Sequence, residues 1–246
     1  MKAMIFAAGL GTRLRPLTDT CPKALVEVAG RPLLEHVIEK LKKAGFDDIT
    51  INVHHFADMI VDYVRTHHNF GIDIHFSDER GKLLDTGGGI KKAAPLIWRE
   101  GDTAPVLIHN VDILSNADLR LFYETHRQAD AALLVSSRTT RRYLLFGEDN
   151  RLVGWTNTAT GEVKSPYPGL NPARCRKYAF SGIHLFSPTL TSEMDKFGDV
   201  FSIIDFYLSV CRDYKIYGYP QDDLKLLDVG KPGTLHEAGA FLAAIR

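Results

Sequence analysis

Two glycines and two cationic side chains near the N-terminus form the pattern with the clearest chemical meaning in this chain. The apolar run Met4–Ala7 has the composition of a buried strand, and Gly9 and Gly11 follow it with one residue between them. Glycine allows a sharp turn and a close approach of the backbone to a ligand, so that consecutive N–H groups can surround one anion. Arg13 and Lys23 add positive charge beside that turn. The pattern predicts a binding site for a polyphosphate.

Two aspartates are expected at the carboxyl ends of strands. Asp112 follows the apolar run Pro105–His109, and Asp228 ends a late strand just before Gly230. Two carboxylates placed in this way can share one Mg²⁺ ion, which in turn binds nucleotide phosphates. Taken alone, each aspartate also fits a plain structural role as a cap or turn residue.

A run of three glycines, Gly87-Gly88-Gly89, precedes a predicted short helix. Glycines are costly at the start of a helix unless the backbone has to approach another group closely. The run therefore predicts a loop whose backbone approaches a ligand. A plain turn before a helix is the alternative.

The elements that would position these residues follow the order of an α/β protein. Apolar strands alternate with amphipathic helices in the first half, which requires crossover connections and a largely parallel sheet with helices on both faces. Ligands of such sheets bind beyond the carboxyl ends of the strands, where Gly9 and Asp112 fall. The predicted strands are Lys2–Ala7, Ile49–Val53, Ile72–Phe76, Pro105–His109 and Ala131–Ser136, and the predicted helices are Pro32–Ala44, Ala57–His67, Gly89–Leu96 and Asp118–Gln128.

The second half has shorter predicted strands and a long polar segment. Residues Asn157–Arg176 are rich in glycine, proline and polar side chains, which predicts a loop. No repeat or linker interrupts the chain, so we expect one domain over residues 1–246, whose two halves differ in character and divide at about residue 136. The other predicted strands are Leu144–Phe146, Leu152–Thr156, Tyr178–Phe186, Lys215–Tyr219 and Lys225–Val229, and the helices are Ile203–Tyr214 and Pro232–Ile245.

The composition limits the partners of the chain. Its 246 residues carry 30 lysines and arginines against 30 aspartates and glutamates, which argues against a general binder of nucleic acid or membrane surfaces. Three scattered cysteines favour a reducing compartment over a disulfide framework or a zinc site. No apolar stretch is long enough to span a bilayer. A cytoplasmic protein is expected, and its oligomeric state is left open.

The opening segment resembles the signature of the sugar-1-phosphate nucleotidylyltransferases, also called NDP-sugar pyrophosphorylases. The resemblance lies in Gly-x-Gly-Thr-Arg-Leu-x-Pro-Leu-Thr from Gly9 to Thr18, followed by Lys23 after Pro22. It implies a Rossmann-like nucleotide-diphospho-sugar transferase fold with a smaller sugar-side β subregion, in which residues up to about 136 form a nucleotide-binding half and residues 137–246 a sugar-phosphate-binding half. It also implies transfer of a nucleoside monophosphate from an NTP to a sugar 1-phosphate, with Mg²⁺ as cofactor. The short length, the glycine run and Phe180-Ser181-Gly182-Ile183 look most like the N-acetylmuramate-1-phosphate uridylyltransferases of cell-wall recycling.

The resemblance also implies roles for individual residues. Arg13, Lys23 and Asp112 are the catalytic group: Arg13 neutralises the departing pyrophosphate, and Lys23 bridges the two reacting phosphates. Asp112 and Asp228 hold the metal. The nucleotide-binding residues are Ala8, Gly9, Gly11, Thr12, Arg13, Gly87 and Gly88, with Ala8, Gly87 and Gly88 near the base, and the sugar-phosphate-binding residues are Lys23, Asn110, Gly182 and Asp228.

The chain departs from the family pattern at two places. Valine stands at position 111, where relatives commonly have the glycine of Asn-Gly-Asp, and the Glu-Lys-Pro of the sugar side is missing at Gly154–Thr158. Glu162 and Lys164 lie nearby at a different spacing. The sequence therefore does not predict which nucleobase and which sugar the substrates carry. A GTP-dependent mannose-1-phosphate guanylyltransferase, a cytidylyltransferase acting on a non-sugar phosphate or a phosphonate, and a non-catalytic NDP-sugar-binding subunit are the alternatives.

Overall fold

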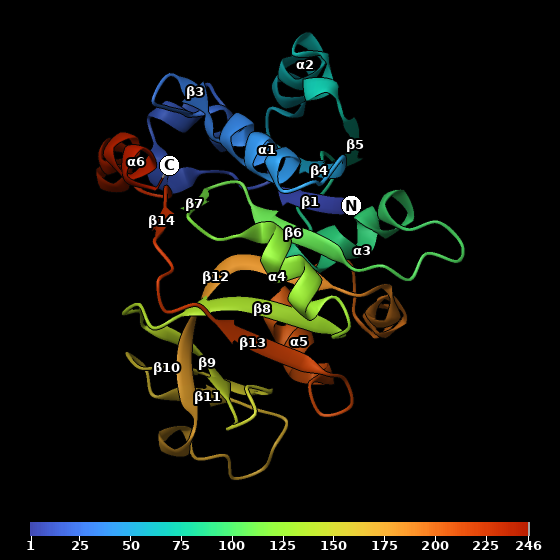
Figure 1. Ribbon diagram of the computed structural model, residues 1–246, viewed down its shortest axis with the longest axis vertical. Helices are drawn as coiled ribbons and strands as arrows, with labels where there is room; N and C mark the ends of the chain where they lie inside the picture. The colour runs from blue at the N-terminus through green and yellow to red at the C-terminus, as the bar shows by residue number, and fades with distance from the viewer. Residues whose placement is uncertain (246) are drawn as a thin grey trace.

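One sheet of ten strands forms the centre of the molecule, and helices cover both of its faces (Figure 1). The computed structural model describes residues 1–245. Along most of the sheet the strand order is β11-β10-β9-β12-β6-β1-β4-β5, and β8 joins it by pairing with β12 and with β13. The strands are β1 Lys2–Phe6, β4 Asp48–Val53, β5 Asp73–Asp78, β6 Val106–Asn110, β8 Ala131–Ser136, β9 Arg142–Phe146, β10 Leu152–Asn157, β11 Glu162–Lys164, β12 Arg176–Phe186 and β13 Ile216–Pro220.

The strands from the first half of the chain form the parallel part of the sheet. β1 lies between β4 and β6, and β5 lies beyond β4, all of them parallel. Parallel neighbours need a crossover, which helices supply in this chain. The carboxyl ends of β1 and β6 therefore meet at one edge. The helices are α1 Leu33–Lys43, α2 Ala57–Thr66, α3 Asp85–Ile97, α4 Leu119–His126, α5 Ile203–Val210 and α6 Pro232–Ala244.

Alternation along the strands sends side chains into two apolar cores. Ala3 and Ile5 of β1 face the core that holds the buried side chains of α1, α2, α4 and α6. Met4, between them in sequence, faces the second core with the buried side chains of α3 and α5. Successive side chains of a strand point to opposite faces, so one apolar strand supplies both cores. The predicted α/β class with helices on both faces is confirmed.

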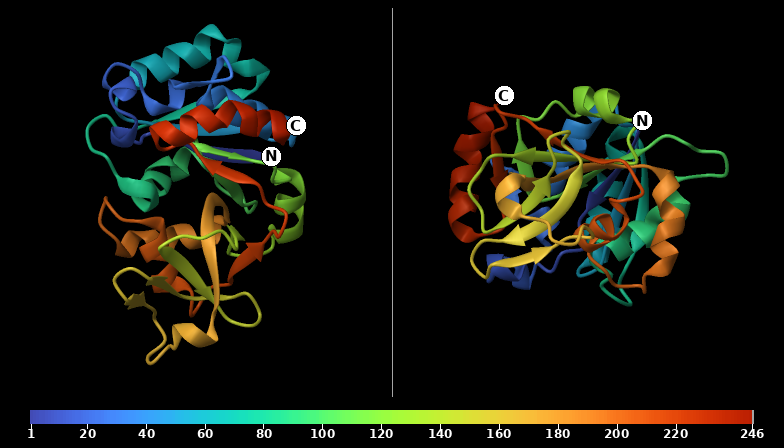
Figure 2. Two further views of the ribbon diagram at one scale, coloured as in Figure 1. Left: turned by 90° about the vertical axis from the view of Figure 1, so that its left-hand side faces the viewer. Right: turned by 90° about the horizontal axis from the view of Figure 1, so that it is seen from below.

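The second half of the chain adds antiparallel strands below this core (Figure 2). The strand β12 is long: it pairs with β9 at one end and with β6 at the other. The predicted loop Asn157–Arg176 is wrong in part, because β10 continues to Asn157 and β11 pairs back onto it at Glu162–Lys164. The polar exposed face of this hairpin hides the alternation that would have predicted it. The sheet runs through both halves, and the division into a nucleotide half (residues 1–136) and a sugar half (residues 137–246) stays a prediction.

Two small pairs of strands lie outside the main sheet. β7 Ile113–Ser115 pairs with β14 Leu226–Asp228, and β2 Glu27–Val28 pairs with β3 Arg31–Pro32. The first pair corrects the prediction, which treated Lys225–Val229 as one more strand of the sheet and contained no strand after Asp112. It joins the end of the chain to the carboxyl edge of the nucleotide half. Within residues 1–245 no helix is both long and apolar enough to cross a membrane.

Candidate active site

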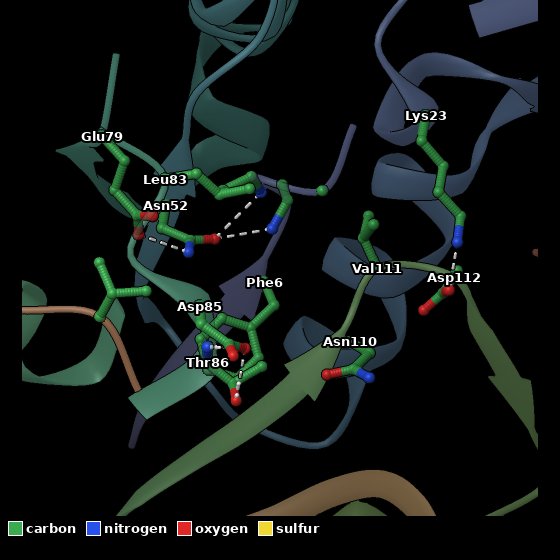
Figure 3. A pocket seen from close by; sticks show the side chains of 14 residues that line it. Phe6, Lys23, Asn52, Glu79, Leu83, Asp85, Thr86, Asn110, Val111 and Asp112 are labelled. Atoms are coloured by element: carbon green, nitrogen blue, oxygen red, sulfur yellow. Dashed lines mark hydrogen bonds and ion pairs between the residues drawn. The ribbon is translucent and has the colours of Figure 1, made fainter. Parts of the chain in front are cut away.

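A cavity of about 490 Å³ opens at the carboxyl edge of the sheet, at the ends of β1 and β6 (Figure 3). Ala8 and Gly9 border it on one side, and Asn110 and Asp112 border it on another. This is the edge where ligands of parallel sheets bind. The other lining residues are Phe6, Ala7, Lys23, Asn52, Glu79, Leu83, Asp85, Thr86, Val111 and Val200.

Lys23 and Asp112 form an ion pair at the cavity wall, as Figure 3 shows. Lys23 begins a 3₁₀ turn, Lys23–Leu25, after Pro22, and its side chain is nearly buried. A buried ammonium is costly without a partner, and the Asp112 carboxylate supplies one by hydrogen bonding to Nζ. The pair places a cation and an anion side by side at the wall of the cavity, where the two reacting phosphates are predicted to bind.

Asp228 is brought beside Asp112 by the β7–β14 pair. Asp228 lies opposite Ile113 in that pair, and the N–H of Val229 donates to the carbonyl of Asp112 at 2.8 Å. Although the Asp228 side chain keeps a face open to solvent, the surrounding protein desolvates it, which raises the pKa of its carboxyl. The nearby Asp112 carboxylate raises that pKa further. The structure therefore brings together two residues that lie more than a hundred positions apart in sequence.

Arg13 approaches the same aspartate over Gly230. A Cβ at position 230 would lie 2.5 Å from Nη2 of Arg13 and 2.6 Å from Oδ1 of Asp228. Real Cβ atoms do not come this close to other atoms, so glycine is needed here for the two side chains to approach. The Arg13 charge opposes the rise in the pKa of Asp228. Arg13, Lys23, Asp112 and Asp228 thus form one cluster at the cleft.

The donor set of Asp112 and Asp228 fits a divalent metal that binds through carboxylates and completes its shell with water and phosphate oxygens. Mg²⁺ is usually held by one or two carboxylates plus substrate phosphates and not by an all-protein cage. In residues 1–245 no group of three or more His, Cys, Asp or Glu side chains is gathered for a metal. Two carboxylates held next to each other, with the pKa of one raised by the other, are a place where a cation is favourable.

The loop after β1 offers backbone N–H groups to the cleft. Gly11 has a left-handed φ of 65°, and a Cβ there would lie 2.9 Å from Cγ2 of Thr18. The carbonyl of Gly11 accepts hydrogen bonds from the Thr18 hydroxyl and the Leu14 N–H, both at 2.8 Å. Among the described residues, none accepts a hydrogen bond from the N–H groups of Gly9, Gly11 or Thr12. Thr12 and Arg13 are exposed, and of this loop Ala8 and Gly9, but not Gly11, Thr12 or Arg13, are among the described residues that line the cavity.

Asn52 and Glu79 are buried polar residues of the cavity wall that the sequence analysis did not identify. Oδ1 of Asn52 accepts the N–H of Ala7 at 2.7 Å and that of Ala8 at 3.3 Å, and Nδ2 donates to Oε1 of Glu79 at 2.7 Å. The other Glu79 oxygen accepts the N–H of Leu84 at 3.3 Å. Burial raises the pKa of Glu79. The run Ile49–Val53 contains two polar residues, Thr50 and Asn52, and the position of Asn52 near the carboxyl end of the strand was the available signal.

The glycine run has a packing role that differs from the expectation. The helix α3 begins at Asp85, so Gly87 and Gly88 lie inside its first turn, and neither lines the cavity formed by the described residues. Their N–H groups donate to the carbonyl of Phe201, at 2.9 and 3.3 Å. A Cβ at Gly88 would lie 1.9 Å from the carbonyl oxygen of Asp199, and one at Gly87 would lie 2.3 Å from the Phe201 ring. The glycines let a segment of the sugar half dock on α3, and the cavity wall is formed by Asp85 and Thr86 instead.

Gly182 lies behind the cavity, against Asn110. It has φ of 77° in an irregular part of β12, where the pairing with β8 shifts register between Phe180 and His184. A Cβ there would lie 2.7 Å from Nδ2 of Asn110. Of the two, Asn110 reaches the cavity, and Gly182 makes room for the Asn110 side chain.

Comparison with known proteins agrees with this geometry. A family model described as nucleotidyl transferase matches residues 2–147. An N-acetylmuramate alpha-1-phosphate uridylyltransferase of Caulobacter vibrioides is 32% identical over 98% of this chain and 96% of its own length. Its counterpart of the same name in Neisseria meningitidis serogroup B is also 32% identical, over 99% of each chain. Among solved structures, HddC from Yersinia pseudotuberculosis, complexed with GMP-PN, superimposes with a TM-score of 0.75 at 23% identity, covering 98% of this chain and 99% of its own.

Proposed function

The chain belongs to the nucleotidyl transferase family and is a sugar-1-phosphate nucleotidylyltransferase, and on that premise we propose that it uses UTP and N-acetylmuramate 1-phosphate as substrates. The observation that carries the choice of substrates is the full-length similarity to two uridylyltransferases for this sugar phosphate. That similarity extends beyond residue 147, where the family model stops, and so includes the sugar half. The same proposal includes that the enzyme is cytoplasmic and makes nucleotide sugars for the cell wall.

The proposed reaction is an in-line displacement at the α-phosphorus of UTP. A phosphate oxygen of the sugar 1-phosphate forms a new bond to that phosphorus, and the bond to the β-phosphate breaks, so that pyrophosphate leaves. The nucleophile is already an anion, so no general base is required. Positioning and charge neutralisation supply the catalysis.

Different residues of the cleft bind the triphosphate and neutralise the charges of the reacting phosphates. The N–H groups of Gly9, Gly11 and Thr12 hold the triphosphate, and Arg13 neutralises the pyrophosphate as it leaves. Lys23 lies between the two reacting phosphates and lowers their mutual repulsion, and its pairing with Asp112 keeps the ammonium in place before the substrates bind.

The base and the sugar would occupy opposite ends of the cavity. The uracil lies between Ala8 and the start of α3, where Asp85 and Thr86 border the cavity. Gly87 and Gly88 support that wall from behind through Phe201. The sugar lies beside Asn110, which Gly182 backs.

A divalent metal is generally used by members of the family, and we propose that Mg²⁺ is the ion in this chain. Asp112 and Asp228 would hold it. When bound, it supplies positive charge to the α-phosphate that the protein cations do not provide.

Pyrophosphate release across a panel of substrates tests the proposal. UTP, GTP, dTTP, CTP and ATP are each paired with N-acetylmuramate 1-phosphate, N-acetylglucosamine 1-phosphate, glucose 1-phosphate and mannose 1-phosphate, with Mg²⁺ present. We expect the highest kcat/KM for UTP with N-acetylmuramate 1-phosphate. A higher value for GTP with mannose 1-phosphate would replace the proposed substrates, and CTP preference would point to a cytidylyltransferase. Binding of nucleotide without turnover of any pair would favour a non-catalytic subunit.

A further inference from the structure

The sugar side of the cleft needs a cation that the sequence signature does not supply. If the proposed function holds, an anionic sugar 1-phosphate has to lie against the anionic α-phosphate of UTP, which requires positive charge from both sides. Lys23 is paired with Asp112, and Arg13 lies beside Asp228. These two cations are thus shared with carboxylates and with the triphosphate, so a further donor on the sugar side would strengthen the binding of the incoming phosphate.

Lys164, the lysine nearest in sequence to the missing Glu-Lys-Pro, is already paired. Its Nζ lies 3.0 Å from Oδ1 of Asp205 on α5 and 5.4 Å from the centroid of the Trp155 ring. An ion pair and a cation–π contact hold its charge on the β10–β11 hairpin. Lys164 therefore does not meet the requirement.

Arg138 lies at the correct edge of the sheet for this task. β8 is antiparallel to β12, which is antiparallel to β6, so β8 and β6 run in the same direction. β8 ends at Ser136, and Arg138 follows two residues later, at the edge where β6 delivers Asn110 and Asp112. The N–H of Gln221 donates to the carbonyl of Val135 at 3.2 Å, so the end of β8 lies beside the connection that leads to β14 and Asp228 (Figure 1).

One hydrogen bond fixes Arg138 against the sugar-side strand. Its Nη2 donates to the carbonyl of Phe180 at 3.0 Å. Phe180 directly precedes the irregular part of β12 that contains Gly182, and Gly182 lies against Asn110 of the cavity. Arg138 is thus tied to the sugar-side strand, next to the part of it that lies against Asn110.

The charge of the Arg138 guanidinium is not paired with a carboxylate of the described residues, and most of its N–H donors are unused. The side chain is exposed, and within residues 1–245 no carboxylate lies within ion-pair distance of it. Arginine carries five N–H donors in a planar fork that matches two phosphate oxygens, and the bond to Phe180 uses one of them. The bond to Phe180 holds the guanidinium beside the sugar-side strand and leaves most of its donors available.

We propose that Arg138 binds the phosphate group of the incoming sugar 1-phosphate and replaces the lysine that the family signature places on the sugar side. Lys23 then contacts that phosphate from the nucleotide side and Arg138 from the sugar side. The ligand class is a phosphate monoester on a sugar carbon, whichever sugar it carries.

Steady-state kinetics of Arg138→Ala tests the proposal through the two Michaelis constants. Loss of a charged hydrogen-bond donor to phosphate weakens binding roughly 10- to 100-fold. We expect KM for the sugar 1-phosphate to rise by that factor, and KM for UTP to change less than about twofold, because the triphosphate is held by the loop after β1. Arg138→Lys should recover part of the loss. Arg176→Ala is the matched control: Arg176 is an exposed arginine at the start of β12, bonded to Asn150, about 20 Å along the strand from Gly182.

The possible outcomes separate this proposal from that of the substrates. Equal KM values for the sugar phosphate in Arg138→Ala and Arg176→Ala would overturn the role of Arg138. A parallel rise of both Michaelis constants in Arg138→Ala, without recovery in Arg138→Lys, would indicate a structural role and overturn it as well. If wild type turns over a different pair, the proposed substrates are wrong, and the same variants are compared on that pair. If no pair reacts, equal affinities of wild type and Arg138→Ala for N-acetylglucosamine 1-phosphate by calorimetry would overturn the proposal.

Discussion

In the nucleotide half, the residues expected to bind phosphate lie in one short segment between Ala8 and Lys23, whereas the residues proposed to act on the sugar side come from separate strands. Asn110 lies against Gly182 of β12, Arg138 follows β8, and Asp228 ends β14. Phosphate binding by backbone N–H groups needs a particular local loop, which a continuous motif can encode. This chain lacks the continuous Glu-Lys-Pro of the sugar side of its relatives, and the side chains proposed for that side converge from several strands instead.

The first test of this difference removes the ammonium of Lys23, which lies in the segment between Ala8 and Lys23. We expect Lys23→Ala to lower kcat by about 10²-fold or more, the scale of losing one charge-stabilising group. The loss also leaves Asp112 without its partner. Pyrophosphate release by the purified variant, with Lys177→Ala on the exposed start of β12 as control, provides the measurement. Turnover close to that of wild type in a folded Lys23→Ala protein would show that the Lys23 ammonium is not needed for catalysis.

The second test concerns the contact between α3 and the segment 199–201 of the sugar half. Gly88→Ala places a Cβ 1.9 Å from the carbonyl oxygen of Asp199, so the segment 199–201 has to move. Overpacking of this kind costs roughly 1–3 kcal/mol of stability. Gly239→Ala is the matched control, because a Cβ there meets nothing within 4 Å in the middle of α6. It should leave stability unchanged or raise it by up to about 1 kcal/mol. Urea unfolding measures both, and equal stabilities of the two variants would rule out close docking at α3.

The smallest expected effect is a pH dependence from Glu79 in the wall of the nucleotide half. Burial raises the pKa of this carboxyl above its ordinary 4.5. A carboxyl whose pKa is higher in the folded than in the unfolded chain adds stability below the unfolded pKa and loses it as the pH rises through the folded value. Between about pH 4.5 and 7, the free energy of unfolding of wild type should therefore fall relative to that of Glu79→Gln, which does not titrate. Urea unfolding at several pH values measures the difference, and a constant difference between the two proteins would contradict the assignment.

The sequence predicted the fold class and most strands of the nucleotide half because each combines a local apolar pattern with turn residues. It missed β7 and the pairing of β7 with β14, since two three-residue strands distant in the chain leave no periodicity to detect. It also missed β11, whose residues are all exposed. β7, which pairs with a distant strand, and β11, which is exposed, are thus the strands least visible in sequence.

Among the candidate site residues, the cluster of Arg13, Lys23, Asp112 and Asp228 lies together in the structure, although their roles stay predictions. The glycine run was recognised as special, but the partner that requires it is the distant segment at Asp199–Phe201 and not the cavity. Asn52 and Glu79 were not identified because a polar residue within a strand or just after one does not reveal its partner in the sequence. The sequence analysis did not identify Arg138, because no local motif shows that the sheet places it beside Phe180.

Pyrophosphate release from UTP and N-acetylmuramate 1-phosphate, measured for wild type, Asp112→Asn and Asp213→Asn, tests the central claim most directly. Asp213 is an exposed aspartate between α5 and β13, at the edge of the sheet away from the cleft. We expect wild type and Asp213→Asn to release pyrophosphate at similar rates and Asp112→Asn to be slower by about 10²-fold or more. Comparable rates for all three folded proteins would contradict the assignment of the chemistry to the Asp112 cluster.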